Sequence, residues 1–241
     1  MNRLFALIPA GGGGSRAGID VPKQYHPILG RPMLAHTIGR LASALPLAAT
    51  FVAIAPRDDH YAAAIGALPG VEPLPCGGPT RAATVANALA MLASRCAPDD
   101  WILVHDAARP CVPASALTGL VAALEGDPVG GLLAIPVADT LKRGDGAADP
   151  RVVRTEDRRP LWRAQTPQMF RYGVLARAFR EPGAASVTDE SGAVELLAAR
   201  GACAMPRLVA GSRANLKVTW PEDFAIAAAI LAAQASGGSA S

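Results

Sequence analysis

The chain lacks the features that mark nucleic-acid-binding, secreted and membrane proteins. Its 241 residues carry a formal net charge of only +3, and no run of lysines and arginines is long enough to follow a nucleic-acid backbone. No apolar stretch reaches membrane-spanning length. The first apolar run ends at Pro9 and the glycines that follow, so it is typical of a strand and not of a signal peptide. We therefore expect no nucleic-acid partner and no membrane partner.

Cysteine and histidine are equally scarce. The cysteines show no Cys-x-x-Cys spacing and no nearby pair of histidines; they are Cys76, Cys96, Cys111 and Cys203. This pattern argues against a metal cluster or a disulfide framework, and reduced thiols in the cytoplasm are the better interpretation. His105 has no second histidine or cysteine near it in the sequence, so we interpret it as structural.

Most of the sequence alternates between apolar, strand-like runs and helix-like segments. The predicted strands cover residues 4–10, 50–55, 71–76, 101–105, 130–137 and 214–219. The predicted helices cover residues 31–45, 58–68, 80–94, 113–125, 173–180, 188–200 and 221–235, with Thr80 and Thr188 as N-caps. This alternation predicts an α/β fold, a single Rossmann-like domain whose mostly parallel, twisted sheet is covered by helices. The domain is predicted over residues 1–235, and the small, polar residues 236–241 are predicted to form a disordered tail.

One segment, residues 139–160, interrupts the alternation. It is charged, contains Gly144, Gly146 and Pro150, and has no helical period. Its only strand-like piece is Val152-Val153-Arg154. Composition leaves two structures open, a β-arm that projects from the body and a flexible surface loop. We predict the projecting β-arm.

The loop after the first strand predicts an anion site. Gly11 to Gly14 have no Cβ, so their backbone N–H groups can approach an anion closely, and Arg16 and Lys23 add positive charge beside them. Such a cradle suits a triphosphate. A P-loop is excluded because the chain has Gly14-Ser15-Arg16 where Gly-Lys-Ser/Thr is needed. A dinucleotide fingerprint is weak, because Pro22 interrupts the expected helix and the acidic residue about 20 positions on is missing. A glycine turn without a ligand is the remaining alternative.

Three other positions are candidates for chemistry. Asp106 follows a predicted strand, where an acid often faces a metal ion or a ribose; the alternative is a capping carboxylate paired with Arg109. Thr84 follows a glycine pair and could present its hydroxyl to a base; the alternative is a buried β-branched residue in a capped helix. Lys217 lies in an apolar run, which is unusual for lysine and marks it as a candidate site cation.

Taken together, these motifs resemble a known family. Pro-Ala-Gly-Gly-x-Gly-x-Arg followed by Pro-Lys-Gln-Tyr, then His-Asp-Ala-Ala-Arg-Pro from His105, is similar to the signature of the sugar-phosphate nucleotidyltransferases. The nearest members are the 2-C-methyl-D-erythritol 4-phosphate cytidylyltransferases of isoprenoid biosynthesis. Further matches in the right order are Asp139-Thr140, Thr155 to Arg158, Gln165 to Gln168 and Asn215 to Thr219. The chain departs from the family at Gly11, Pro79 and Thr84, where alanine, aspartate and serine are common.

The resemblance implies a transfer of the cytidylyl group from CTP to 2-C-methyl-D-erythritol 4-phosphate, with release of pyrophosphate. It implies that Arg16 and Lys23 stabilise the transition state and that Arg158 and Lys217 hold the attacking phosphate. It places the nucleotide on the loops that carry Ala10, Gly11, Gly12, Gly78, Thr84, Asp106 and Ala107, and the acceptor on Arg109, Thr140 and Thr166. Mg²⁺ is the expected cofactor, held mostly by the nucleotide phosphates, with Asp106 as its candidate protein ligand.

The family's arm crosses to a second subunit, so the resemblance also implies a homodimer with exchanged arms and with Arg158 acting in trans. Two alternative functions remain: a cytidylyltransferase for another polyol phosphate, such as ribitol 5-phosphate, and a non-catalytic nucleotide-binding protein on the same fold. A dinucleotide-dependent oxidoreductase is disfavoured by Pro22 and the missing acidic residue.

Overall fold

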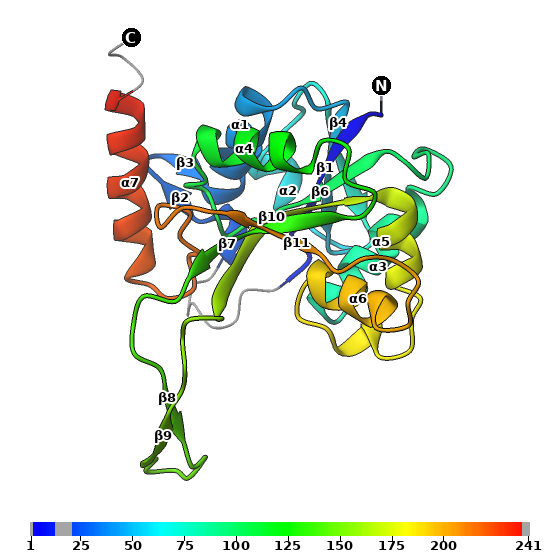
Figure 1. Ribbon diagram of the computed structural model, residues 1–241. Helices are drawn as coiled ribbons and strands as arrows, with labels where there is room; N and C mark the ends of the chain where they lie inside the picture. Colours follow the sequence, from blue (N-terminus) through cyan, green and yellow to red (C-terminus); the bar gives the residue numbers. More distant parts are fainter. Residues whose placement is uncertain (1, 13–20, 238–241) are drawn as a thin grey trace.

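The fold is built on a seven-stranded sheet. A computed structural model describes residues 2–12 and 21–237, and in it the strand order is β11-β7-β10-β6-β1-β4-β5 (Figure 1). The strands are β1 (Leu4–Pro9), β4 (Ala49–Ile54), β5 (Val71–Pro75), β6 (Trp101–Val104), β7 (Gly130–Pro136), β10 (Trp162–Arg171) and β11 (Arg207–Ala210). All pairings are parallel except those of β10, which runs antiparallel to both β6 and β7. The predicted mostly parallel, Rossmann-like sheet is confirmed.

Helices cover both faces of the sheet, as the alternation along the chain predicted. The helices are α1 (Met33–Ala44), α2 (Tyr61–Ala64), α3 (Arg81–Met91), α4 (Ala114–Leu124), α5 (Tyr172–Ala178), α6 (Glu190–Ala198) and α7 (Asp223–Gly237). Along β1, Leu4, Ala6 and Ile8 pack in a core with α1, α2 and α4. Phe5 and Leu7 pack in a second core with α3, α5 and α6. Successive strand residues point to opposite faces, so β1 contributes side chains to both cores. A strand that is buried on both sides has to be apolar throughout, as β1 is.

The amino-terminal hairpin and the last helix form a third, smaller core. Strands β2 (Pro27–Ile28) and β3 (Arg31–Pro32) pair antiparallel just before α1. Helix α7 packs against this hairpin through Ala227 and Leu231, which meet Ile28 and Met33. The end of the chain is thereby brought beside the segment that follows the glycine loop.

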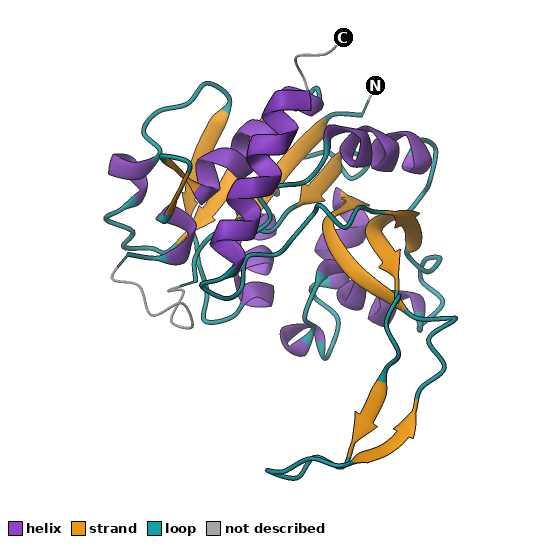
Figure 2. Cartoon of the chain, turned by 90° about the vertical axis from the view of Figure 1, so that its left-hand side faces the viewer, coloured by secondary structure: helices purple, strands orange, loops and turns teal. Residues whose placement is uncertain are grey.

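The predicted arm is present as a hairpin. Strands β8 (Lys142–Gly144) and β9 (Val152–Thr155) pair antiparallel, and the two strands project away from the sheet and its helices (Figures 1 and 2). Val152 and Val153 are 64% and 59% exposed, so the hairpin is not packed against the described part of its own chain. The pairing of β8 with β9 confirms the predicted projecting β-arm.

The strand prediction was wrong at the carboxyl-terminal end. Residues 214–219 form a loop, because their backbone groups bond to Ala108 and to side chains instead of a neighbouring strand. Strand β11 lies a few residues earlier. The long strand β10 was missed because Pro167 argues against a central strand, since proline cannot donate a ladder hydrogen bond. The proline is accommodated by a register shift between Ala164 and Gln168, which takes this stretch out of the ladder with β7.

Most predicted helices agree with the structure to within two or three residues at each end. The segment predicted as a helix over 58–68 is helical only over Tyr61–Ala64 and is followed by Gly66 in the left-handed region. Thr80 caps α3 as predicted, but α6 is capped by Asp189 and not by Thr188. Helix α7 reaches Gly237, so the first two residues of the predicted tail are helical; residues 238–241 lie outside the described residues.

The structure also bears on the cysteines and on membrane spans. All four cysteines are free. Among the described residues, no helix is long and apolar enough to cross a membrane.

Candidate active site

The candidate active site lies at the carboxyl edge of the parallel strands. The loops after β1, β5 and β6 meet there, and antiparallel β10 begins at the same edge. This is the edge at which open α/β sheets bind ligands, because strand ends and helix starts leave loops free to carry side chains. It gathers residues that are far apart in the sequence.

Asp106 is the centre of a charged cluster at this edge. The residue follows β6 and is 7% exposed. Its Oδ1 accepts from Arg81 Nε at 2.9 Å, and its Oδ2 lies 2.9 Å from Lys217 Nζ and 3.6 Å from Arg109 Nε. One carboxylate thus serves three cations. Burial alone would raise the pKa of Asp106, but Arg81, Lys217 and Arg109 together hold it well below its usual range.

Arg81 is fixed from two sides. The fully buried Glu190, the first residue of α6, receives Arg81 Nη1 at 2.7 Å and Nη2 at 3.0 Å in a bidentate pair. Burial raises the pKa of Glu190, and the adjacent guanidinium opposes that shift. Arg81 and Glu190 were not among the predicted site residues. The available signals were Arg81 directly after the Thr80 cap of a glycine-led helix and Glu190 in the first turn of a helix, a position that the helix dipole alone also favours for an acid.

A buried hydrogen-bond chain supports Asp106 from behind. Thr166 Oγ1 accepts from the Asp106 backbone N–H at 2.9 Å and lies 3.0 Å from His105 Nδ1. His105 Nε2 lies 3.1 Å from the Arg109 carbonyl oxygen. Burial lowers the pKa of His105 to about 4, so the ring is neutral. The Thr166 hydroxyl then donates to Nδ1, and Nε2–H donates to the carbonyl. This supports the structural interpretation of His105.

The loop over residues 211–219 closes the site from the carboxyl-terminal side. Val218 donates to the Ala108 carbonyl, and Arg109 Nη1 donates to the Asn215 carbonyl at 2.7 Å. Lys23 Nζ donates to the Val218 carbonyl at 2.8 Å. These bonds place Lys217 on Asp106 and bring the amino-terminal Lys23 next to the same loop. Lys217 was expected on a strand; it lies on a loop but does reach the site.

The glycine loops approach each other closely. A Cβ on Gly11 would lie 2.9 Å from Gly77 Cα, so the alanine common in the resembling family would push these two loops apart. Gly78 N–H donates to Thr84 Oγ1 at 3.0 Å, and that hydroxyl donates to the Thr80 carbonyl at 3.0 Å. The Thr84 hydroxyl therefore holds the glycine loop in place. Because Oγ1 already accepts one hydrogen bond and donates its proton, it has only one lone pair left with which to accept a hydrogen bond from a base. Ala10 is similarly engaged, through Ala53 and through the Gln24 side chain.

The structure brings together most predicted site residues. The loops and ion pairs described above connect Ala10, Gly11, Gly78, Thr84, Asp106, Ala107, Arg109, Thr166, Lys23 and Lys217 at one edge, with Gly12 continuing the first loop. Arg16 lies outside the described residues. Thr140 is exposed at the base of the arm, and Arg158 donates to the Ala138 carbonyl of its own chain. Neither contacts the Asp106 cluster, so their roles, and arm exchange, stay predictions.

The charged cluster does not fit a protein-held metal ion. Both oxygens of Asp106 already face cations, and the described residues contain no group of three or more His, Cys, Asp or Glu side chains that could hold a metal. The prediction that Asp106 ligates Mg²⁺ is thus not supported by the geometry. The donor set fits a divalent cation that enters with the phosphates of its nucleotide.

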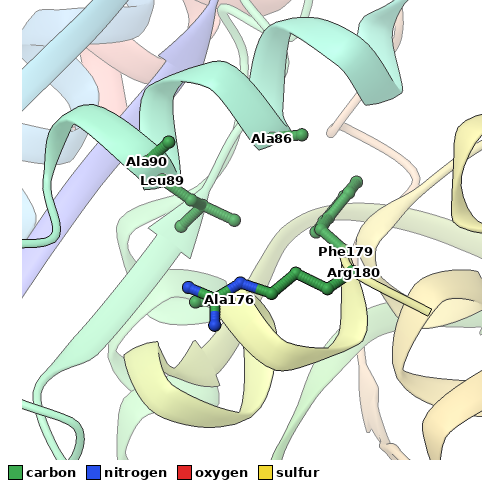
Figure 3. A pocket seen from close by; sticks show the side chains of 6 residues that line it. All are labelled: Ala86, Leu89, Ala90, Ala176, Phe179 and Arg180. Atoms are coloured by element: carbon green, nitrogen blue, oxygen red, sulfur yellow. The ribbon is translucent and has the colours of Figure 1, made fainter.

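A cationic cavity opens beside the cluster. It has a volume of about 230 Å³ and is lined by Arg109, Arg163, Ala164, Gln165, Arg213, Asn215, Leu216 and Lys217. A different, apolar cavity of about 120 Å³ lies between α3 and α5 and is lined by Ala86, Leu89, Ala90, Ala176, Phe179 and Arg180, whose guanidinium lies beside Ala176 (Figure 3). The first of these two cavities is lined by four cationic side chains and the second by one, so the first is better suited to receive a phosphate.

Glycine loops beside fixed cations at the carboxyl edge of a Rossmann-like sheet fit the phosphates of a nucleotide, and the enzyme class with which they agree is the nucleotidyltransferases. The family model described as 2-C-methyl-D-erythritol 4-phosphate cytidylyltransferase matches residues 4–233, and the chain belongs to this family. A relative of that name from Dechloromonas aromatica is 49% identical over 97% of this chain and 100% of its own. One from Laribacter hongkongensis is 50% identical over 98% of this chain and 100% of its own.

Solved structures agree with these relatives. A crystal structure of 4-diphosphocytidyl-2C-methyl-D-erythritol synthase matches with a TM-score of 0.82 and 39% identity, covering 96% of this chain and 99% of its own. The 2-C-methyl-D-erythritol 4-phosphate cytidylyltransferase of Francisella tularensis matches with a TM-score of 0.79 and 31% identity, covering 95% of this chain and 100% of its own. The resemblance found in the motifs is thereby confirmed.

Proposed function

We propose that the protein transfers the cytidylyl group of CTP to 2-C-methyl-D-erythritol 4-phosphate, forming 4-diphosphocytidyl-2-C-methyl-D-erythritol and pyrophosphate. The observation that carries this proposal is the Asp106 cluster. One buried carboxylate positions Arg81, Arg109 and Lys217 between the glycine loops and a cationic cavity, in a chain that matches the cytidylyltransferase family over 4–233.

The reaction needs positive charge more than it needs a base. A phosphate monoester has its second pKa near 6, so at pH 7 it is already largely dianionic and can attack the α-phosphorus of CTP directly. His105, the histidine nearest the site in sequence, is buried, neutral and hydrogen-bonded on both nitrogens, which fits a reaction without a histidine base. What the chain supplies is orientation and electrostatic stabilisation of the charge that builds up on phosphorus and pyrophosphate.

Each part of the edge then has a role. The loops of Ala10–Gly12 and Gly78 hold CTP, which arrives as its Mg²⁺ complex. Lys23 and Arg16 have the role that the family resemblance implies, which is to stabilise the departing pyrophosphate. Lys217 and Arg109 face the attacking phosphate. Asp106 does not touch the reacting atoms in this scheme. It orients the side chains of Arg109 and Lys217 through its ion pairs with them. We further propose a homodimer in the cytoplasm, in which the exposed arm carries Thr140 and Arg158 to the second subunit's site.

The comparisons do not favour the ribitol phosphate or non-catalytic alternatives. A direct test measures pyrophosphate release with Mg²⁺ and CTP, using 2-C-methyl-D-erythritol 4-phosphate, ribitol 5-phosphate or no acceptor. We expect release with the first acceptor and only background with the others. Release with ribitol 5-phosphate alone would assign a different acceptor. If protein that binds CTP releases no pyrophosphate with either acceptor, the function is non-catalytic nucleotide binding.

A further inference from the structure

We propose that Arg163 and Arg213 bind the phosphate of the acceptor and make the enzyme select its dianionic form. This inference rests on the proposed function and adds two residues that the family motifs did not point to. It follows from the position, the bonding and the charge of the two guanidinium groups.

Arg163 and Arg213 line two neighbouring cavities at once. Both line the cavity of about 230 Å³ beside Arg109 and Lys217. Both also line a neighbouring cavity of about 200 Å³ whose other lining residues are Ile135, Pro136, Ala138 and Asp139. A ligand with a phosphate in the first cavity would therefore place its remaining atoms toward the second, whose lining includes one carboxylate, that of Asp139.

Two different segments bring these arginines together. Arg163 lies on β10 opposite Ile135 of β7. Arg213 lies on the loop after β11, and Gln165 Nε2 donates to the Ser212 carbonyl at 2.9 Å, which ties that loop to β10. The pair is thus positioned by the sheet, on the side of β6 away from the glycine loops of β1 and β5. An anion bound here is separate from the nucleotide phosphates.

Both side chains are exposed, and within the described part of the chain neither guanidinium makes a hydrogen bond or an ion pair. Each retains its five N–H donors, in the planar arrangement that matches a phosphate. Arg109 beside them is less available, since Nη1 is bonded to the Asn215 carbonyl and Nε faces Asp106. Burial lowers the pKa of Arg109, and the positive charge of Arg163 adds to that shift, so these cations crowd one another.

The charge balance then decides what the cavity can accept. Four cationic side chains line the first cavity, and no acidic one does. Asp106 offsets one of these charges through its contacts with Lys217 and Arg109, which leaves three. Without Arg163 and Arg213 only one positive charge would remain. A phosphate monoester carries about −1.5 to −2 at pH 7, so one of the two arginines is enough to match the dianion, and the cavity falls short of it only when both are removed.

The test compares Arg163→Gln, Arg213→Gln and the double variant with Arg180→Gln, which removes the same charge beside the apolar cavity of Figure 3. With CTP and 2-C-methyl-D-erythritol 4-phosphate, each site variant should raise the acceptor KM about tenfold, the size of one lost charge-assisted hydrogen bond. KM for CTP should not change, and Arg163→Lys should retain part of the affinity. Arg180→Gln should behave as the wild type.

Two further readouts separate phosphate binding from a structural effect. In the wild type, the KM for the acceptor should fall as the pH rises through about 6 and the phosphate loses its second proton, and the double variant should lose most of this fall. Calorimetry with inorganic phosphate should show binding that the double variant weakens. An unchanged acceptor KM, or an equal rise in KM for CTP, would overturn the inference. If the wild type releases no pyrophosphate with any acceptor, the proposed function fails, and the phosphate titration still decides whether these arginines bind phosphate.

Discussion

The sharpest prediction concerns Asp106→Asn, which removes one charge and keeps the shape of the side chain. Arg81 retains its bidentate pair with Glu190, and Lys217, whose side chain is 47% exposed, can be solvated. Arg109 is 11% exposed and would be left without a counter-charge. We therefore expect a loss at the lower end of the range for a broken buried pair, about 3 kcal/mol. For a chain of this size that lowers Tm by about 6–12 °C.

The effect on anion binding has the opposite sign. Removing a negative charge about 8 Å from a bound phosphate that carries about −1.5 to −2, at an effective dielectric constant near 20, favours the anion by about 3–4 kcal/mol before ionic screening. Screening that halves this value leaves about 1.5–2 kcal/mol, or roughly 10- to 30-fold tighter binding of inorganic phosphate. Turnover should fall about 100-fold, because Arg109 and Lys217 lose the group that orients them.

The assay combines thermal unfolding, phosphate calorimetry and a Mg²⁺ titration of pyrophosphate release, with Asp99→Asn as the control that removes an exposed carboxylate elsewhere. Weaker phosphate binding and a raised Mg²⁺ requirement would instead identify Asp106 as a metal ligand. The pH dependence adds a check. The pKa of Asp106 is lowered in the folded state, so its stabilisation is complete above the ordinary carboxyl value of about 4 and declines as pH falls below it. The stability gap between wild type and Asp106→Asn should be constant above about pH 5 and shrink in acid.

Three further predictions test other parts of the site. Lys23→Ala should lower kcat by about 100-fold or more with the fold intact by circular dichroism, since it removes a cation at the leaving group; retained turnover would reject that role. Arg158→Ala chains mixed with Arg16→Ala chains should regain part of the activity if the arm acts in trans, and light scattering should show a dimer; mixed dimers without rescue would indicate a site within one subunit. Thr166→Val should destabilise the protein by about 1–3 kcal/mol in urea unfolding, because it leaves His105 Nδ1 and a backbone N–H unpaired; an unchanged midpoint would exclude that network as a stabilising element.

The sequence predicted the layout of the sheet better than it predicted the bonding of the site. The parallel strands were found because they are short apolar runs between helices. Strand β10 was not found, since Pro167 and the polar residues around it break the pattern, and only its neighbours β6 and β7 explain how the proline is accommodated. Local pattern contains no information about such neighbours.

The same limit applies to the candidate site. Motif order was enough to find Asp106, Arg109 and Lys217. It did not show that Arg81 and Glu190 complete the cluster, because those contacts span 25 and 109 residues of sequence and exist only when the sheet edge has formed. It also suggested that Thr84 faces a base, whereas its hydroxyl mainly holds the glycine loop in place.

The bond from Lys23 to the Val218 carbonyl joins residues that are 195 positions apart. A nascent chain that has emerged through β10 already has strands β1, β4, β5, β6, β7 and β10 but has neither Lys217 nor the carbonyl that Lys23 binds. Contacts of such long sequence separation form late, because the entropy of closing the loop must be overcome before they contribute. If Lys23 and Lys217 act as proposed, turnover requires residues 217 and 218 to be in place, so it reports on folding more strictly than the content of helix and strand does.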